Sequence, residues 1–293
     1  MKMVINMDNQ LVIRNIKDFE PKHTFECGQC FRWNRQLDDS YTGAVRGHVF
    51  NISKENGSII VKSDMPDPEE ILLDYLDLQT DYSTIKGELS KDPIMSKAID
   101  YGYGIRILKQ EHWECLASFI ISANNRIPMI MRSVENIARD FGKPIEFNGS
   151  TYFSFPPPEV IVDVNEDRLT LCGVGFRCKY IKHAARMVAS GEVDLNALEN
   201  MDSGSARGEL MKIPGVGPKI ADCVLLYSYG KSDVFPTDVW IKRVIEVLYF
   251  GREAKLPEIQ EFARRKFGSL AGAAQQYLFY YARENKIGSP ERK

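Results

Sequence analysis

The sequence predicts an α+β protein in which an N-terminal antiparallel sheet packs on a larger, all-helical part. Short apolar runs alternate with turn-forming residues up to about residue 65, as in strands. After Pro66, apolar residues recur at spacings of three and four, as in helices. A tight glycine turn joins two of the helical segments. Strands and helices in separate blocks along a chain are typical of the α+β class.

The first domain is predicted to span residues 1–95 and to contain the sheet and a following helix. Asn56 and Gly57 favour a two-residue turn, which makes the strands on either side antiparallel. The helix at 66–79 begins with proline and acidic residues, which are common in a first helical turn. Strands are expected at 3–7, 11–16, 23–27, 30–34, 41–47, 48–53 and 58–63.

The second domain is predicted to span residues 96–293 and to be helical, interrupted by a proline-rich loop at 156–158. No internal repeat is visible. Its amphipathic segments lie at 111–125, 127–142, 178–192, 203–213, 219–230, 238–250, 256–268 and 272–285.

Composition and charge exclude few functions. The chain has 293 residues, 44% of them hydrophobic, and no run approaches the roughly 18 apolar residues of a membrane span. The start lacks the pattern of a signal peptide, so we expect a cytoplasmic protein. The first 100 residues hold 12 basic and 17 acidic side chains, and the remainder holds 26 and 23. Any DNA-facing surface should therefore lie in the second part, although an ordinary solvated surface explains this imbalance equally well.

The six cysteines are scattered along the chain and are expected to stay reduced. Cys27 and Cys30 form a CxxC pair, which is half of a typical zinc site. No second pair follows, so neither disulfides nor zinc are expected.

The segment 211–250 carries the strongest functional signal. Gly215 and Gly217 flank Val216, which permits a sharp turn with positive φ and a close approach by another molecule. Pro218 suits the first position of the next helix, so free N–H groups would point outward at its N-terminus and hold a phosphate. A purely structural corner between two helices explains the same glycines.

Lys219 and Asp238 are the candidate catalytic residues. Lys219 lies on the first helical turn, where the helix dipole and partial burial disfavour its ammonium form. A neutral amine attacks electrophilic carbon and forms Schiff bases. Asp238 lies at a helix start, where it serves as an N-cap, and the same carboxylate can also act in catalysis.

The strings IPGVGPKIADC and FPTDVWIKRV resemble the helix-hairpin-helix Gly/Pro/Asp signature of DNA glycosylases, most closely the 8-oxoguanine DNA glycosylases. The resemblance implies an enzyme that flips 8-oxoguanine out of double-stranded DNA and excises it through a Schiff base on Lys219, assisted by Asp238. It also implies strand cleavage by β-elimination at the resulting abasic (AP) site, which is AP lyase activity. The hairpin, placed at 205–230, would grip phosphate, sometimes with a cation of unknown identity held by turn carbonyls.

The resemblance also assigns a base pocket. In CGQCFRW, Gly28 matches the glycine whose carbonyl contacts N7–H of the lesion, a hydrogen that guanine lacks. Gln275 would bind the Watson–Crick edge, Phe279 would stack on the base, and Cys223 would cover its other face. From the residues alone, Gly28 is a bulge or turn glycine, Phe279 and Cys223 are core residues, and Gln275 is solvated.

Two further motifs match residues that fill the gap left by the flipped base. FIISANNRIP assigns Asn124 to the orphaned partner base. GVGFRCKYI assigns Phe176 as an aromatic wedge and Arg177 as a contact to the same base. An ordinary core aromatic and an ordinary surface charge are the alternatives for these last two residues.

Three positions depart from the family pattern. Met129 stands where better-known members have an arginine that helps to select cytosine, so we expect relaxed opposite-base selectivity. Trp240 replaces a histidine near the phosphate of the lesion, and Arg126 replaces an asparagine.

Other functions are open from the sequence. Glycosylases for oxidised pyrimidines or mismatched adenine typically carry four clustered cysteines for an iron–sulfur cluster, and no cysteine follows Cys223. Alkylated-base glycosylases usually lack a lysine like Lys219. A non-catalytic helix-hairpin-helix protein would bind DNA without turnover.

We expect no required cofactor, no iron–sulfur cluster, no membrane partner and a monomer.

Overall fold

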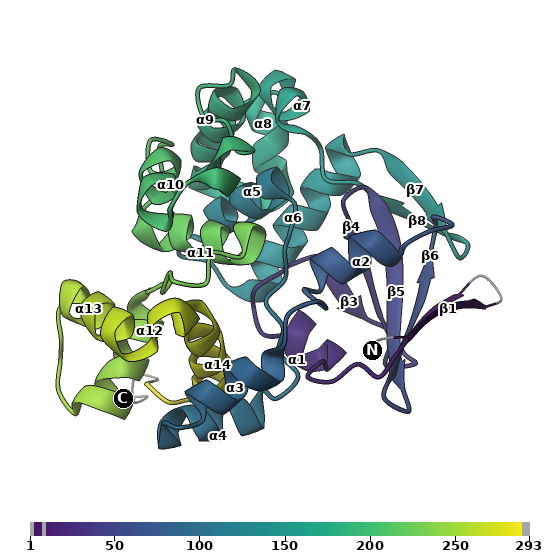
Figure 1. Cartoon of the computed structure of the whole chain (residues 1–293). Coiled ribbons are helices and arrows are strands. Elements are labelled where there is room, and N and C mark those ends of the chain that lie inside the picture. Colours follow the sequence, from purple (N-terminus) through teal and green to yellow (C-terminus); the bar gives the residue numbers. More distant parts are fainter. Residues whose placement is uncertain (1–2, 8–9, 289–293) are drawn as a thin grey trace.

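A computed structural model describes residues 3–7 and 10–288, which form an antiparallel sheet and a larger helical region (Figure 1). The strands of the sheet are β1 (Met3–Met7), β2 (Gln10–Arg14), β3 (Trp33–Arg35), β4 (Tyr41–Val45), β5 (His48–Glu55) and β6 (Ser58–Ser63). Their order is β1-β2-β6-β5-β4-β3, with every neighbouring pair antiparallel. The Asn56-Gly57 turn joins β5 to β6 with φ of 47° and 75°. The predicted α+β class is confirmed.

The strand expected at 23–27 is wrong, because this part of the chain holds the short helix α1 (Pro21–Phe25). Pro21 occupies the first helical turn, where its fixed φ favours helix. The Thr24 N–H then bonds the Glu20 carbonyl at 2.9 Å. One helical turn is too short to show a 3.6-residue period, so the alternation in the sequence was misleading.

The remaining helices follow the sheet in the chain. Asp81, Asp92, Glu111 and Asp202 cap four of them through side-chain oxygens. The helices are α2 (Glu69–Tyr75), α3 (Tyr82–Leu89), α4 (Pro93–Tyr101), α5 (His112–Ser122), α6 (Ile127–Phe141), α7 (Pro158–Asp163), α8 (Glu166–Leu169), α9 (Cys178–Ala189), α10 (Ser203–Leu210), α11 (Pro218–Tyr229), α12 (Val239–Ile245), α13 (Leu256–Phe267) and α14 (Ala271–Glu284).

The helical region also contains a small hairpin that the sequence analysis did not predict. It consists of β7 (Pro144–Phe147) and β8 (Ser150–Phe153). Asn148 and Gly149 form its turn with φ of 49° and 74°. This is the same Asn-Gly chemistry that marked the turn between β5 and β6.

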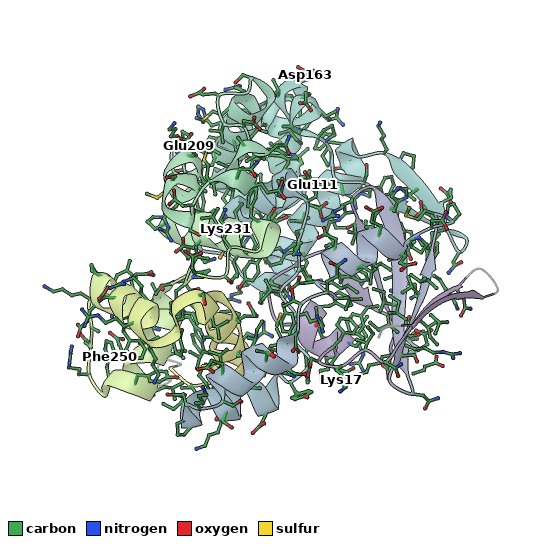
Figure 2. All side chains as sticks on the ribbon, viewed as in Figure 1. Lys17, Glu111, Asp163, Glu209, Lys231 and Phe250 are labelled. Atoms are coloured by element: carbon green, nitrogen blue, oxygen red, sulfur yellow. The ribbon has the colours of Figure 1, made fainter. Side chains whose placement is uncertain are left out.

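The helices form two lobes with α11 between them (Figure 1). The first lobe contains α5 to α10, and the second contains α12 to α14 together with α3 and α4, which pack beside α14. Figure 2 shows Glu209 in the first lobe and Phe250 in the second. The domain boundary at residue 95 stays a prediction. None of the helices that the structure describes is long and apolar enough to cross a membrane.

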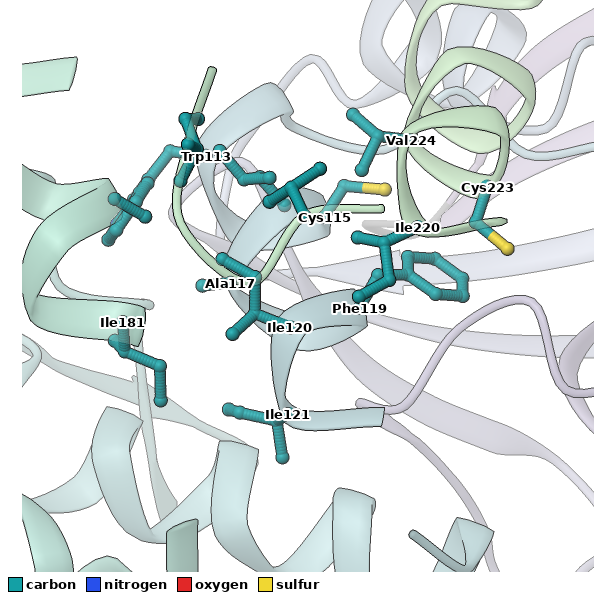
Figure 3. Close-up of a cluster of buried hydrophobic side chains, with 14 of the residues drawn as sticks. Trp113, Cys115, Ala117, Phe119, Ile120, Ile121, Ile181, Ile220, Cys223 and Val224 are labelled. Carbon is teal, nitrogen blue, oxygen red and sulfur yellow. The ribbon is translucent and has the colours of Figure 1, made fainter. Parts of the chain in front are cut away.

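Each part of the molecule has its own apolar core. The core of the first lobe gathers α5, α6, α9 and α11, and Figure 3 shows Ile220 and Cys223 of α11 facing Phe119 of α5. A second core joins α4, α12, α13 and α14, and a third lies between the sheet and α2. The turn that contains Gly28 lies where these cores meet, because Cys27 belongs to the second core and Cys30 to the third.

Candidate active site

The hairpin between α10 and α11 is a tight turn at which only one glycine has positive φ. Gly215 has φ of +87°, and a Cβ there would lie 2.5 Å from Cγ of Tyr180. Gly217 has φ of −94°, and a Cβ there would meet nothing within 4 Å. The expected sharp turn with positive φ is present, and Gly215 is the glycine that adopts it. Nothing in the described part of the chain requires a glycine at Gly217.

The hairpin presents the N-terminus of α11 to solvent. The Val216 N–H donates to the Ile213 carbonyl at 3.0 Å, and the Val216 side chain is buried. Val216 therefore stabilises the turn. Gly217 is the N-cap of α11, and Pro218 occupies the first turn as predicted. The first-turn N–H groups of α11 have no acceptor within their own helix. These N–H groups are therefore not used within the helix itself.

A cavity of about 770 Å³ lies between the two lobes beside this hairpin. Lys219 and Asp238, the two candidate catalytic residues, both line it. Its other walls come from the loop after α5, the hairpin, the start of α12 and Leu256: Ser122, Ala123, Asn124, Asn125, Gly217, Pro218, Ile220, Thr237, Val239, Trp240, Lys242, Arg243 and Leu256. A lysine amine and a carboxylate thus face one space that can admit a nucleotide.

Lys219 and Asp238 are both half-buried and are positioned by their helices. The Nζ of Lys219 lies 5.4 Å from the ring centroid of Phe119, so the amine lies over an aromatic face. Oδ1 of Asp238 accepts a hydrogen bond from the Ile241 N–H at 2.7 Å, which caps α12. In the described part of the chain, Oδ2 of Asp238 makes no hydrogen bond. The carboxylate therefore has one oxygen that fixes it and one that is available to the cavity.

Cys223 lies one helical turn after Lys219 and is buried. Burial raises the pKa of its thiol to about 11, and the nearby charge of Lys219 opposes this only in part. The thiol is therefore neutral at physiological pH, which makes Cys223 an apolar surface rather than a nucleophile.

The CxxC pair shows no sign of metal binding. The Cys27 thiol donates to the Thr24 carbonyl at 3.2 Å, and burial raises its pKa to about 12. The Cys30 thiol likewise points to a carbonyl, that of Phe25, at 3.7 Å. Within residues 3–7 and 10–288, no group of three His, Cys, Asp or Glu side chains is arranged to hold a metal ion.

Gly28 adopts φ of +91° and lies against the last helix of the chain. A Cβ there would be 3.2 Å from Cε1 of Phe279 and 3.2 Å from Nη1 of Arg283. The structure therefore brings together Gly28 and Phe279, two predicted pocket residues that are far apart in the sequence. Among the described residues, no donor bonds the Gly28 carbonyl.

Two buried glutamines hold the Gly28 turn, and neither is among the residues predicted from the sequence. The Gln29 amide nitrogen donates to the carbonyls of Thr24 at 2.9 Å and Arg106 at 2.7 Å, and its oxygen accepts from the Leu108 N–H at 3.0 Å. The Gln276 amide donates to the Cys27 carbonyl at 3.1 Å. Their polar side chains within apolar runs were the available signal, because buried amides need partners.

Gln275 is buried, with 4% of its surface exposed, so the solvated interpretation of this residue is wrong. Its Oε1 accepts a hydrogen bond from the Tyr227 hydroxyl at 3.3 Å. The same single hydroxyl hydrogen is shared with Oε1 of Gln276, the nearer acceptor, so one tyrosine of α11 contacts both glutamines of α14. Gln275 and Phe279 are one turn apart on that helix.

The residues matched to the gap come from the segment after α5, the start of α6 and a 3-10 turn before α9, and Arg177 of that turn bonds the segment after α5. Phe176 and Met129 are exposed apolar side chains, at 59% and 45%. Asn124 is exposed and has φ of 49°. Arg177 is buried and donates to the carbonyls of Ala123 at 2.7 Å and Asn124 at 2.9 Å. Its guanidinium thus fixes the Asn124 loop, and the surface-charge interpretation of Arg177 is wrong.

The predicted site residues form two adjacent groups rather than one surface. Lys219, Asp238, Asn124 and Gly217 line the cavity, whereas Gly28, Phe279, Gln275 and Cys223 do not. Trp240 lines the cavity too, and its Nε1 is buried without a partner in the described chain. Arg126 is exposed immediately before α6.

Family models cover most of the chain. Residues 11–116 match the 8-oxoguanine DNA glycosylase N-terminal domain, and residues 117–269 match the HhH-GPD superfamily of base excision DNA repair proteins. The chain belongs to the 8-oxoguanine DNA glycosylase family of that superfamily. The resemblance inferred from the hairpin, Lys219 and Asp238 is confirmed.

Individual relatives agree over nearly full length. The probable N-glycosylase/DNA lyase of Methanothermobacter thermautotrophicus is 35% identical over 80% of this chain and 83% of its own. The 8-oxoguanine glycosylase/lyase of Clostridium acetobutylicum, solved with double-stranded DNA containing cytosine opposite 8-oxoguanine, is 42% identical with a TM-score of 0.93, covering 98% of this chain and 99% of its own. MBOgg1, solved with a low-affinity DNA ligand, is 50% identical with a TM-score of 0.95, covering 98% and 99%.

Proposed function

We propose that this chain is a bifunctional DNA glycosylase that excises 8-oxoguanine from double-stranded DNA and then cleaves the strand as an AP lyase. The observation that carries the proposal is the pairing of Lys219 and Asp238 across one cavity beside the hairpin. The relatives named N-glycosylase/DNA lyase and 8-oxoguanine glycosylase/lyase support it. A protein that only binds DNA would use Asp238 solely as the cap of α12 and would bind lesion-containing DNA without excising the base.

The chemistry assigns distinct roles to the two residues. The Lys219 amine forms a bond to C1′ of the damaged nucleotide while the bond from C1′ to the base breaks, and the base leaves with the bonding electrons. Asp238 accepts the proton that the amine loses and stabilises positive charge on the sugar. Opening of the sugar ring then gives a Schiff base, which permits β-elimination of the 3′ phosphate.

The lesion is proposed to bind against the Gly28 turn. The Gly28 carbonyl accepts N7–H of 8-oxoguanine and repels the N7 lone pair of guanine. Gln275 binds the Watson–Crick edge, while Phe279 and the neutral thiol of Cys223 cover the two faces. The rigid support of the turn by Gln29 and Gln276 favours this role, because a reading carbonyl must keep its position.

Two other surfaces contact the DNA in this proposal. Asn124 and Phe176 fill the gap left by the flipped base, and Arg177 supports the Asn124 loop. The turn of Gly215, Val216 and Gly217, with the first N–H groups of α11, holds a phosphate. The open space at Gly217 suits the close approach of a DNA backbone.

Trapping with borohydride tests the nucleophile. Reduction of the Schiff base should leave the protein covalently attached to DNA containing 8-oxoguanine. Lys219→Gln should abolish trapping and reduce excision at least about 10⁴-fold, since the bond-forming amine is lost. Lys91→Gln, an exposed lysine paired with Glu88 outside the hairpin, is the matched control and should trap normally. Trapping that survives Lys219→Gln would place the nucleophile elsewhere.

Met129 is proposed to relax the choice of opposite base. It is exposed at the start of α6, and a thioether cannot donate to the acceptors of cytosine. Excision rates with cytosine, adenine, thymine or guanine opposite 8-oxoguanine should differ by less than about tenfold, and Met129→Arg should favour cytosine. A strict cytosine requirement in the unsubstituted protein would contradict this proposal.

We further propose that the reaction needs no cofactor or iron–sulfur cluster and that the protein acts as a cytoplasmic monomer. The chemistry is supplied by an amine and a carboxylate, and the six cysteines are free and buried. A cation at the hairpin turn stays a proposal, for which activity in the presence of a chelator is the test.

A further inference from the structure

Arg283, on the last turn of α14, is the residue of the base pocket that neither the sequence motifs nor the proposed mechanism uses. Its Nη2 donates to the Glu26 carbonyl at 2.6 Å, and its Nε donates to Glu284 at 2.9 Å. The guanidinium carbon lies 5.7 Å from the ring centroid of Phe279 and 5.4 Å from that of Tyr280. The guanidinium is therefore held in one orientation by two hydrogen bonds and two aromatic rings.

The third nitrogen of this guanidinium, Nη1, has no partner among the residues that the structure describes. Nη1 is buried and makes no hydrogen bond within the described part of the chain. It lies beside Gly28, since a Cβ at Gly28 would be 3.2 Å from it. A buried donor without an acceptor costs free energy, and native proteins rarely keep one unless another molecule supplies the acceptor.

The lesion supplies such an acceptor at the right place. 8-Oxoguanine differs from guanine at two adjacent atoms, because N7 gains a hydrogen and C8 gains a carbonyl oxygen, O8. The Gly28 carbonyl, an acceptor, can recognise only N7–H. A donor next to Gly28 is needed to recognise O8, and Arg283 Nη1 is a buried, unpaired donor there, as far as the described residues extend.

We propose that Arg283 is a specificity-determining residue that donates a hydrogen bond from Nη1 to O8 of the flipped 8-oxoguanine. The inference rests on the proposed function and deepens it. Gly28 and Arg283 together present an acceptor beside a donor, which matches the donor and acceptor at N7 and C8 of the lesion. Guanine has an acceptor at N7, which the Gly28 carbonyl repels, and a C–H at C8, which leaves Nη1 unpaired.

Three DNA substrates test the proposal. Duplexes carry 8-oxoguanine, 8-thioguanine or an abasic site at the same position. Sulfur is a weak acceptor, so 8-thioguanine keeps N7–H but weakens the bond to Arg283. The abasic site has no base, so cleavage there needs Lys219 but no pocket. The measured quantities are single-turnover rates of excision and of strand cleavage.

Arg283→Met removes the donors and keeps an unbranched apolar side chain. It should lower excision of 8-oxoguanine about 10-fold to 100-fold, which is typical for the loss of a buried hydrogen bond from a charged group. Its effect on 8-thioguanine should be several times smaller, and cleavage at the abasic site should change less than twofold. Arg283→Lys should retain part of the activity, because one ammonium cannot reach the Glu26 carbonyl and O8 together. Arg264→Met, an exposed arginine of α13, is the matched control.

Two results would overturn the proposal. An equal loss on 8-oxoguanine and 8-thioguanine would mean that Arg283 supports the turn but does not contact O8. A parallel loss of cleavage at the abasic site, in both Arg283 variants, would mean that it supports the fold as a whole. Failure of the proposed function looks different, because the unsubstituted protein would then not excise 8-oxoguanine at all.

Discussion

Two glycine turns of this molecule are proposed to contact DNA through backbone atoms, and they are built in opposite ways. The Gly28 turn is surrounded by protein. Gln276 and Arg283 donate to the carbonyls of Cys27 and Glu26 just before Gly28, and Gln29 just after it donates to the Arg106 carbonyl. Phe279 packs against the turn. The hairpin turn at Gly217 is open, because a Cβ added there would meet nothing within 4 Å.

The difference corresponds to what each turn has to recognise. A carbonyl that distinguishes N7–H from a lone pair acts over a few tenths of an ångström, so it needs a rigid surrounding. A phosphate is a large, sequence-independent anion, and binding it needs only exposed N–H groups at a helix start. Rigidity at Gly28 therefore serves the selection of 8-oxoguanine over guanine, and open space at Gly217 serves affinity for the DNA backbone.

Among the changes to the two glycine turns, the largest expected effect comes from a methyl group in the Gly28 turn. Gly28→Ala should lower excision of 8-oxoguanine at least about 100-fold, because the residue must keep φ of +91° and its Cβ would press on Phe279 and Arg283. Cleavage of an abasic duplex should fall much less, since no base has to be bound. Single-turnover rates on the two substrates measure the difference.

Gly57→Ala is the matched control for backbone strain. Gly57 has φ of +75° in the turn between β5 and β6, and a Cβ there meets nothing within 4 Å. This variant carries the same strain without the pocket, so it should excise at nearly the normal rate. If the Gly28→Ala variant excised 8-oxoguanine as fast as the Gly57→Ala variant, Gly28 would not line the base pocket.

An intermediate effect concerns Glu114 of α5, which lies beside Arg32 in the segment after the Gly28 turn. Burial raises its pKa to about 7, although Nη1 of Arg32 lies 3.8 Å away and lowers it. The folded protein therefore binds a proton that the unfolded chain releases near its ordinary pKa. Stability should fall as pH rises from about 4.5 through 7, by up to about 3 kcal/mol.

Glu114→Gln isolates this contribution, because it removes the titrating group and keeps the shape. Urea unfolding of both proteins at pH 5, 6, 7 and 8 gives the difference in unfolding free energy at each pH. Burial lowers the pKa of His23 and His112, which has the opposite sign but is present in both proteins and cancels. Parallel pH profiles for the two proteins would rule out a proton on Glu114.

The sequence predicted local features better than contacts between distant segments. The α+β class, the Asn56-Gly57 turn and the start of α11 at Pro218 follow from local turn and helix chemistry, and all three are present. The contact between Gly28 and Phe279 was implied only by the family resemblance, because no local pattern links residues so far apart.

Hydrogen-bond partners of buried polar groups were the least predictable part. The polar side chains of Gln29 and Gln276 within apolar runs indicate burial, but the partners of these residues and of Arg283 depend on which carbonyls the fold brings near them. The solvated interpretation of Gln275 failed for the same reason, since its partner Tyr227 comes from another helix. Helix α1 was missed because tertiary contacts and one proline decide so short an element.

The smallest expected effect comes from a methyl group in the open turn. Gly217→Ala should change the melting temperature by no more than about 4 °C, because φ of −94° suits alanine and the Cβ meets no protein atom within 4 Å, while alanine is less favourable than glycine at an N-cap. Its affinity for undamaged duplex DNA should fall about tenfold, because the methyl group occupies space that a phosphate needs. Fluorescence anisotropy with a labelled duplex measures the affinity.

Two other glycines make the result interpretable. Gly208→Ala adds a methyl group to α10 of the same motif, where a Cβ also meets nothing within 4 Å, and it should bind DNA normally. Gly215→Ala should instead lower the melting temperature, because its Cβ would overlap Tyr180. Normal DNA affinity of Gly217→Ala would mean that the open face of the hairpin does not contact the DNA backbone, and the contrast with the Gly28 turn would then reflect packing alone.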